Sequence, residues 1–419
     1  MLHSVVIMWA LSVPVSEDLP EVSDLPAVHE LPSVLRMRDG SPVESADDWR
    51  LRRRPELIGL FQHYMYGYLP EAPEIVITEE VAAVSMFEGE VRYREFAIRF
   101  KGLEGDGAPV IHLALFTPQN AKAPSPVFLG LNKCGNHTVV DHPAVLQRER
   151  AWIHEGCRDV VRGEKESVWN VRYLAERGYA LATFHVDDID LDRPDFSDGV
   201  HPWWSFDDVP PGSRWGTIAA WAFGIHRAVD ALIREDSIDP SRISLIGHSR
   251  RGKTALLAAA LDPRVALVVP HQSGTGGCAL SRANEQETVE RINRVFPHWF
   301  NDTFVEFGDR EERLPFDQHC LIALLAPRPV LETVGIQDAW AGYESSLHAL
   351  RAADPVYALL GADGIRGDGL LDGDGEIDPL QFGDLQQVRR DTEHVLDQAY
   401  WEIILDFADH HLGEPENSN

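Results

Sequence analysis

Apolar and polar residues alternate along much of the segment from residue 74 to residue 132. In VRYREFAIRF, at 91–100, apolar positions are separated by charged ones, which is the pattern of a strand with one covered face. The flanking segments EIVITEEVAAV, PVIHLALFTP and PVFLGLN are also extended in pattern. We therefore predict four successive strands of one sheet, at 74–84, 91–100, 109–118 and 126–132.

From residue 179 onward, short apolar segments alternate with longer ones whose apolar residues recur at helical spacing. The pattern predicts strands at 179–186, 242–248, 264–272 and 329–335, and helices at 215–233, 250–262, 321–327 and 397–412. Strands that alternate with helices indicate an α/β fold with both sheet faces covered. The predicted architecture is a three-layer sandwich around a mostly parallel central sheet.

The first residues, MLHSVVIMWALSVPV, are apolar but too few to span a bilayer, and no Lys or Arg precedes them. The Pro- and acid-rich segment 17–32 has the composition of a linker. Two interpretations of residues 1–18 stay open: a degenerate signal peptide of a secreted or periplasmic protein, or a disordered leader. Since no repeat or linker follows residue 74, we expect one domain over 19–419.

The composition excludes several classes of partner. The 67 acidic residues outnumber the 38 basic ones, and the net charge of −29 has no basic stripe to offset it, so nucleic acid is not an expected partner. No membrane partner is expected, and we expect a monomer. The four cysteines, Cys134, Cys157, Cys278 and Cys320, form no CxxC pair, which argues against a zinc or thioredoxin-like site and leaves any disulfide pairing open.

A serine lies between a predicted strand and a predicted helix, in Gly247-His248-Ser249-Arg250-Arg251-Gly252. Such a turn is the nucleophile elbow of α/β hydrolases, which lifts a serine hydroxyl above the sheet beside the N–H groups of a helix start. The G-x-S-x-G spacing is broken, because Arg251 occupies the place of the second glycine and Gly252 follows. The order of elements still favours a nucleophile over a helix-capping serine.

A nucleophilic serine needs a base and an acid, which follow it in this fold in the order Ser, Asp or Glu, His. Asp338 comes just after the strand predicted at 329–335, and His394 just before the last helix. Both are therefore expected in strand-to-helix loops at the edge of the sheet that carries Ser249. Arg250 follows the nucleophile and is a candidate for oxyanion stabilisation, with a surface salt bridge as the alternative. Lys253, one helical turn on, is expected to point into the same cleft.

The sequence from about residue 132 to residue 412 resembles the bacterial branch of the glucuronoyl esterases, a carbohydrate esterase family. The resemblance rests on GHSRRGKTALLAAALDPR together with WGTIAAWAFGIHRAVDAL, SGTGGCALSR, ETVERINRVFPHWF, FDQHCLIALLAPRPV and EHVLDQAYWEIILDFADHHL. It implies an α/β-hydrolase catalytic domain that cleaves esters between glucuronic acid groups of xylan and lignin alcohols, without a metal or other cofactor.

The resemblance also implies roles for individual residues. Ser249 matches the nucleophile, Arg250 the oxyanion-stabilising arginine and His394 the base. Lys253 matches a lysine that contacts sugar hydroxyls. Glu287 and Trp340 match, more loosely, residues that hold the sugar and stack on it.

The chain departs from the family at two places. Many members carry the catalytic acid as a glutamate where this chain has Gln272, so the acid role is expected to fall to Asp338. Fungal members place cysteines beside the serine and after the histidine, whereas His248 and Val395 stand there in this chain, so that disulfide is absent.

Other functions and sites stay open from the sequence. An acetyl xylan esterase, a general carboxylester hydrolase or a peptidase would keep the same triad, and a carbohydrate-binding pseudoenzyme would have lost it. The acidic segment 363–378 resembles a calcium loop, but its register fails, which favours a solvated loop. Trp203, Trp204 and Trp299 fit either a sugar-binding cleft or the core.

Overall fold

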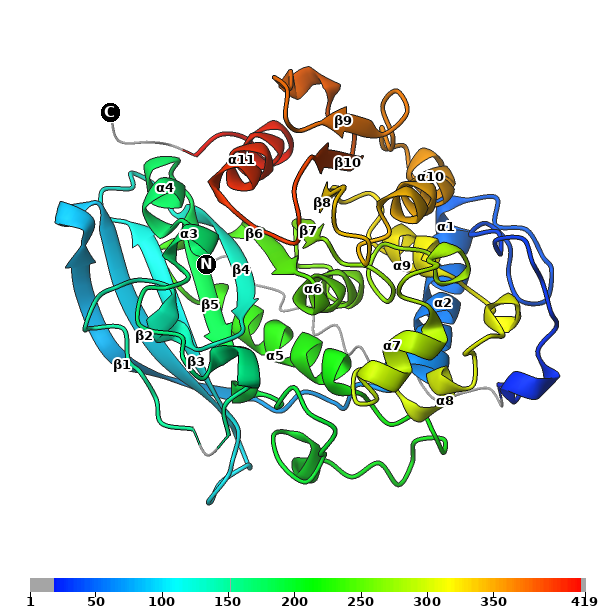
Figure 1. Cartoon of the computed structure of the whole chain (residues 1–419), viewed down its shortest axis with the longest axis horizontal. Helices are drawn as coiled ribbons and strands as arrows, with labels where there is room; N and C mark the ends of the chain where they lie inside the picture. The colour runs from blue at the N-terminus through cyan, green and yellow to red at the C-terminus, as the bar shows by residue number, and fades with distance from the viewer. Residues whose placement is uncertain (1–18, 151, 416–419) are drawn as a thin grey trace, which may run out of the picture.

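The structure of the protein, a computed structural model, describes residues 19–150 and 152–415. The leader predicted at 1–18 lies outside the described residues. The described chain is organised around a ten-stranded sheet (Figure 1). Its strands are β1 Ile75–Met86, β2 Val91–Phe100, β3 Val110–Pro118, β4 Ser125–Asn132, β5 Ala180–His185, β6 Ile238–His248, β7 Leu267–His271, β8 Val330–Gly335, β9 Leu370–Asp372 and β10 Leu385–Arg390.

The strands follow the order β1-β2-β3-β5-β4-β6-β7-β8-β10-β9. The pairs β1–β2, β2–β3 and β3–β5 are antiparallel. From β5 to β9 every neighbouring pair is parallel, so the carboxyl ends of these strands meet at one edge. The sheet is therefore mostly parallel, as the sequence predicts.

Helices cover both faces of the sheet and produce two separate apolar cores. They are α1 Ala46–Asp48, α2 Arg54–Phe61, α3 Glu166–Trp169, α4 Val171–Glu176, α5 Thr217–Leu232, α6 Arg250–Leu261, α7 Val289–Val295, α8 Asp302–Val305, α9 Gln318–Ala323, α10 Tyr343–Leu359 and α11 Gln398–Leu412. Neighbouring residues of one strand enter different cores. Leu129 belongs to the core that includes side chains of α2, α5, α6, α9 and α10, whereas Phe128 belongs to the core that includes side chains of α3, α4 and α11.

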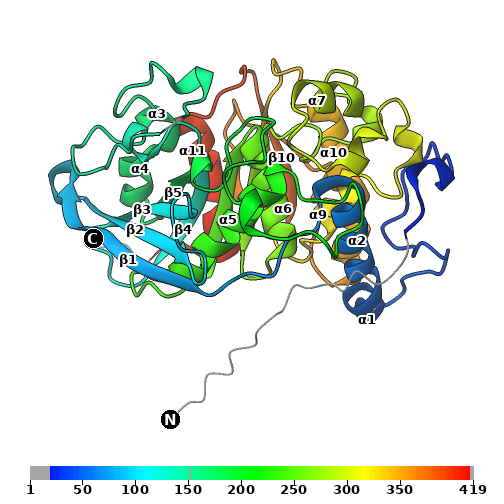
Figure 2. The same ribbon diagram turned by 90° about the horizontal axis from the view of Figure 1, so that it is seen from below.

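Figure 1 shows α4 and α11 on one side of the central strands and α5 and α6 on the other, and Figure 2 shows the same elements from below. The three-layer α/β architecture predicted from the alternating elements is confirmed. No helix in the described part of the chain is both long enough and apolar enough to cross a membrane.

The predicted elements are all present, with shifted ends. The helix expected at 321–327 begins at Gln318, where the side chain of Asp317 accepts a hydrogen bond from the Gln318 N–H, and it ends at Ala323. Further elements lie in segments for which the sequence analysis predicts none, among them the short helices α3, α4, α7 and α8. The larger ones are the helical run 46–66, which contains α1, α2 and two π-helical turns, the long helix α10, and the parallel pair β9–β10.

The turn from β6 to α6 is the tightest connection in the sheet. A Cβ atom added to Gly247 would lie 2.0 Å from the carbonyl oxygen of Arg251, and one added to Gly252 would lie 2.8 Å from the oxygen of Gly247. The two glycines therefore pack backbone against backbone, and the second one is displaced by a single residue from the usual motif. The broken spacing noted in the sequence preserves the packing that the turn needs.

Gly247→Ala should lower the free energy of unfolding by at least about 2 kcal/mol, because the new methyl group has no space unless the turn opens. Gly59→Ala, in the interior of α2 with no atom within 4 Å of its added Cβ, is the matched control. There alanine should be neutral or stabilise by up to about 1 kcal/mol. Chemical denaturation followed by circular dichroism measures both, and equal effects would contradict the steric argument.

Candidate active site

Three loops at the carboxyl edge of the parallel strands bring the predicted triad together. Ser249 lies between β6 and α6, Asp338 between β8 and α10, and His394 between β10 and α11. All three line one pocket of about 210 Å³. Its lining residues are Ser249, Arg250, Lys253, Gln272, Ser273, Gly274, Glu287, Phe296, Trp299, Asp338, Trp340 and His394. Every residue assigned a role from the sequence is therefore in this pocket.

Asp338 and His394 form a directly hydrogen-bonded pair, with 2.6 Å between Asp338 Oδ2 and His394 Nδ1. Burial favours the neutral acid, but the hydrogen bond and charge of His394 and two backbone N–H groups outweigh it, so the pKa of Asp338 lies below its ordinary value. An ionised carboxylate only accepts, so Nδ1 carries the proton and Nε2 of the neutral ring is free to accept one. This is the tautomer that a general base requires.

Ser249 has the backbone geometry of a strained elbow, with φ 63° and ψ −129°. Its N–H donates to the carbonyl of His271 on the neighbouring β7, and its own carbonyl accepts from the N–H of Gly252. These hydrogen bonds hold a non-glycine residue at positive φ, an arrangement that concentrates at functional sites. Ser249 is thus fixed by contacts on both sides of the turn.

Arg250 is held by a carboxylate that the sequence did not single out. Its Nη1 lies 2.5 Å from Asp192 Oδ2, and its guanidinium lies over the rings of Trp299 and Phe296. The other oxygen of Asp192 accepts hydrogen bonds from His298 Nε2 and Trp299 Nε1, each at 2.9 Å. Burial opposes ionisation, but these donors and the Arg250 charge keep the pKa of Asp192 well below its ordinary value.

Lys253 and Glu287 form a buried ion pair, with 3.1 Å between Nζ and Oε2. Nζ also donates to the carbonyls of Ser273 and Thr275, at 2.7 and 2.6 Å, so all three ammonium protons are engaged. Burial lowers the pKa of Lys253 and raises that of Glu287, and their mutual attraction opposes both effects. A hydroxyl that binds Lys253 has to share or replace one of these partners.

Trp340 lies at the rim of the pocket beside the acid. Its backbone N–H donates to Asp338 Oδ1, with 3.2 Å between nitrogen and oxygen. The guanidinium of Arg291 stacks over its ring, with 4.7 Å to the ring centroid. Among the other tryptophans considered from the sequence, Trp299 lines the pocket, whereas Trp204 packs against Phe100, Trp215 and Phe223 in the core.

Gln272, at the end of β7, binds groups other than the catalytic histidine. Its Nε2 donates to the carbonyl of Glu393, and its Oε1 accepts from His248 Nε2. The His248 ring in turn packs against that of His394, with 4.2 Å between centroids. The amide therefore supports the loop that carries His394.

The disulfide left open by the sequence joins Cys134 and Cys157, while Cys278 and Cys320 are free and buried. In the acidic segment 363–378, Asp363 binds the arginine three residues on, and Asp374 binds Arg390 and the N–H of Asp391. The sequence could not reveal the disulfide or the contacts of Asp374, because they join separate segments of the chain.

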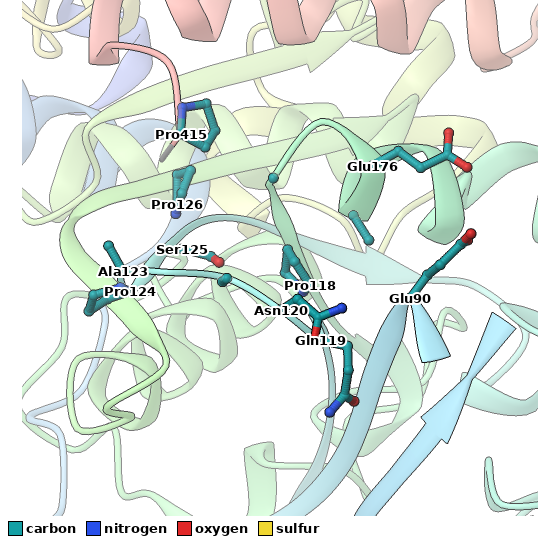
Figure 3. Close-up of a pocket in the computed structure, with 13 residues that line it drawn as sticks. Glu90, Pro118, Gln119, Asn120, Ala123, Pro124, Ser125, Pro126, Glu176 and Pro415 are labelled. Atoms are coloured by element: carbon teal, nitrogen blue, oxygen red, sulfur yellow. The ribbon is translucent and has the colours of Figure 1, made fainter. Parts of the chain in front are cut away.

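Two other features of the described chain could be mistaken for sites. Glu80, Glu95 and His112 come together as potential metal ligands, but Arg148 already binds both carboxylates. A larger pocket of about 310 Å³ lies at the opposite edge of the sheet, beside the start of β4 (Figure 3). Glu90 and Glu176 line it, and none of its lining residues is a histidine, lysine or arginine.

Sequence reasoning missed Asp192 and His298. Asp192 lies in the acid-rich run DDIDLD, where nothing distinguishes one carboxylate from the next. His298 lies within the quoted segment ETVERINRVFPHWF, and its proximity to Trp299 was the only available signal. Asp192 binds Arg250 and His298 binds Asp192, and both contacts join segments that are far apart in the sequence.

Comparisons with known proteins identify the family of the chain. A family model described as glucuronyl esterase, fungi, matches residues 165–361. A curated carbohydrate esterase from an unknown prokaryotic organism is 37% identical over 90% of this chain and 88% of its own. The 4-O-methyl-glucuronoyl methylesterase of Schizophyllum commune is 28% identical over 77% of this chain and 72% of its own.

Solved structures of esterases match almost the whole chain. A promiscuous esterase of the same family from a marine bacterial metagenome is 36% identical, has a TM-score of 0.82, and is matched over 93% of this chain and 99% of its own. The glucuronoyl esterase from Solibacter usitatus is 32% identical, has a TM-score of 0.83, and is matched over 93% and 100%. The chain therefore belongs to the glucuronoyl esterase family of carboxylic ester hydrolases.

Proposed function

We propose that this enzyme hydrolyses esters of 4-O-methyl-glucuronic acid, of the kind that join glucuronoxylan to lignin alcohols. The observation that carries the proposal is the convergence of Ser249 and the Asp338–His394 pair on a pocket that also contains the buried pair Lys253–Glu287. The names of the relatives, a glucuronoyl esterase and a 4-O-methyl-glucuronoyl methylesterase, support the same substrate class.

The proposed reaction is acyl transfer through an acyl-enzyme. His394 accepts the Ser249 proton at Nε2, the serine oxygen attacks the uronate carbonyl, and the alcohol leaves with the proton from His394. Water then attacks the acyl-enzyme by the same route and releases the uronate. Asp338 holds the Nδ1–H and stabilises the imidazolium that forms in each step.

Arg250 is the proposed electrostatic partner of the oxyanion. Its charge is useful only if the guanidinium is fixed where the negative charge develops. Asp192, Trp299 and Phe296 supply that fixation, one through an ion pair and two through ring contacts. Asp192 is therefore a positioning residue that acts through Arg250.

Lys253, Glu287 and Trp340 are proposed to hold the uronate. The buried ion pair presents a fixed arrangement of donors and acceptors, and the indole offers an apolar surface to a sugar face.

The residues 19–419 are proposed to act as one catalytic domain. The disulfide Cys134–Cys157 supports a secreted or periplasmic location, where thiols are oxidised.

A second candidate is a carbohydrate carboxylesterase of broader range, including acetyl esters of xylan. The observation that favours it is the 36% identical relative, which is described as promiscuous. Such an enzyme would use the same triad without depending on Lys253 and Glu287.

The first prediction concerns the triad. Ser249→Ala should abolish hydrolysis of the methyl ester of 4-O-methyl-glucuronic acid, and Asp338→Asn should lower kcat by about 10³ to 10⁴-fold, since an amide cannot stabilise the imidazolium. Asp47→Asn, an exposed change in α1, is the matched control and should leave kcat unchanged. Near-normal turnover by Asp338→Asn would remove this residue from the acid role.

The second prediction separates the two candidate functions. Glu287→Gln should raise KM for the uronate methyl ester at least tenfold while leaving hydrolysis of p-nitrophenyl acetate within about twofold, because only the sugar ester needs the Lys253–Glu287 pair. Initial rates on both esters and on acetylated xylan give the comparison. Unchanged rates on all three substrates, or turnover of acetylated xylan alone, would favour the broader esterase.

The third prediction concerns Asp192. Asp192→Asn should lower kcat about 10 to 100-fold with little change in KM, because Arg250 keeps its charge but loses its position. In a double-mutant cycle, Arg250→Ala should lower kcat much less in the Asp192→Asn enzyme than in the wild type. Additive losses, or a fall in melting temperature that parallels the loss of activity, would contradict a positioning role.

A further inference from the structure

A second pocket, of about 240 Å³, lies beside the nucleophile turn and is not used by the proposed mechanism. Three cations line it: Lys133 just after β4, Lys165 just before α3, and Arg251 in the first turn of α6. We call it the basic pocket. Such a concentration of positive charge contrasts with the net charge of −29 of the whole chain.

The basic pocket and the active-site pocket are lined by different residues of the same turn. Gly247, His248 and Arg251 line the basic pocket, whereas Ser249 and Arg250 line the active-site pocket. Leu396 closes the basic pocket two residues after His394, and the His248 ring packs against the His394 ring. A ligand in the basic pocket therefore lies next to residues that flank both the nucleophile and the base.

Arg251 differs from the other cations at the start of α6. Positive charge is unfavourable near a helix N-terminus, and the first turn of α6 contains no acidic residue. Arg250 has Asp192 as its partner and Lys253 has Glu287. The side chain of Arg251 forms no hydrogen bond or ion pair with any residue that the structure describes, although the residue is partly buried.

Lys133 is the second unpaired cation. Its side chain makes no hydrogen bond or ion pair within residues 19–150 and 152–415, and its Nζ lies close to Gly156, on the segment tied down by the disulfide Cys134–Cys157. Burial and the charges of Arg251 and Arg250 lower the pKa of Lys133 to about 8. The carboxylate whose charge reaches both cations is Asp192, which Arg250, His298 and Trp299 already bind.

Much of the remaining lining of the basic pocket is apolar, and this part would receive the body of a ligand. Trp169, nine-tenths buried, and Leu396 contribute apolar surface to it. The volume is below the roughly 300 Å³ at the low end of pockets for drug-sized ligands, which fits a body of one ring. Two unpaired cations facing an apolar wall match a carboxylate attached to a ring, because the cations would regain the partner that burial denies them.

We propose that the basic pocket binds a small carboxylate with a single-ring apolar body through Arg251 and Lys133. The carboxylate has two potential sources. It is a free acid that binds beside the catalytic centre, or it is part of the alcohol side of the ester, in which case the inference rests on the proposed function.

Binding is tested directly with benzoate as the probe, by calorimetry on the full chain. Benzoate should bind the wild type, and benzyl alcohol, which has the same ring but no charge, should bind at least tenfold more weakly. Arg251→Gln and Lys133→Gln should each weaken benzoate binding at least tenfold, whereas Arg251→Lys should keep most of it. Lys122→Gln, an exposed lysine at the opposite edge of the sheet, is the matched control. Thermal melting of each variant verifies folding.

Hydrolysis distinguishes the two sources of the carboxylate. The benzyl and 4-carboxybenzyl esters of glucuronic acid are compared by kcat/KM in the wild type and in Arg251→Gln. A wild-type preference of at least tenfold for the carboxybenzyl ester, lost in Arg251→Gln, assigns the carboxylate to the substrate. Equal rates, together with benzoate binding, assign it to a free acid.

The proposal is overturned if benzoate does not bind the wild type, or if it binds Arg251→Gln and Lys133→Gln as tightly as the wild type. Failure of the proposed function gives a different result. The enzyme would then cleave neither glucuronate ester, while benzoate binding and its loss in the two variants would remain measurable.

Discussion

The close approach of Gly247 to the backbone of Arg251 is the constraint on which the site depends. The contact leaves no room for a side chain, and it forces the chain to leave β6 and enter α6 within two residues. Ser249 is thereby held at positive φ, with its N–H bound across to β7. The elbow is rigid because backbone packing fixes it. Neighbouring residues of the turn line two different pockets.

The start of α6 has an electrostatic problem, because Arg250, Arg251 and Lys253 place three cations at the positive end of one helix. Buried charges are tolerated when they are paired and hydrogen-bonded. Asp192 compensates Arg250 and Glu287 compensates Lys253, so two of the three charges are fixed as well as neutralised. The same pairing that makes α6 stable places an oriented guanidinium beside the nucleophile. Arg251 is left without a described partner, which is why its pocket differs chemically from the active site.

The sequence predicted the fold and the placement of Ser249, Asp338 and His394 because both depend on the order of the elements. Strand and helix periods identify the α/β layers, and the order Ser, Asp, His places each side chain at a strand end. The pair β9–β10 was missed because LQQVRR is polar, although Gln387 is buried and donates to Glu332 in β8. Asp192, His298 and the disulfide partners were beyond prediction for a related reason: their roles arise from contacts between loops far apart in the chain.

The proposal that Asp338, rather than residue 272, is the catalytic acid follows from which hydrogen bonds each side chain can form. At the end of β7, Gln272 donates to the Glu393 carbonyl and accepts from His248, two tasks that an amide can perform together. A glutamate there would direct a carboxylate oxygen at the Glu393 carbonyl and lose the support of the loop. At the end of β8, Asp338 needs no donor, because one oxygen accepts from His394 and the other from the Trp340 N–H. Asp338, after β8, therefore places a negative charge beside His394, and Gln272, after β7, supports the loop that carries His394.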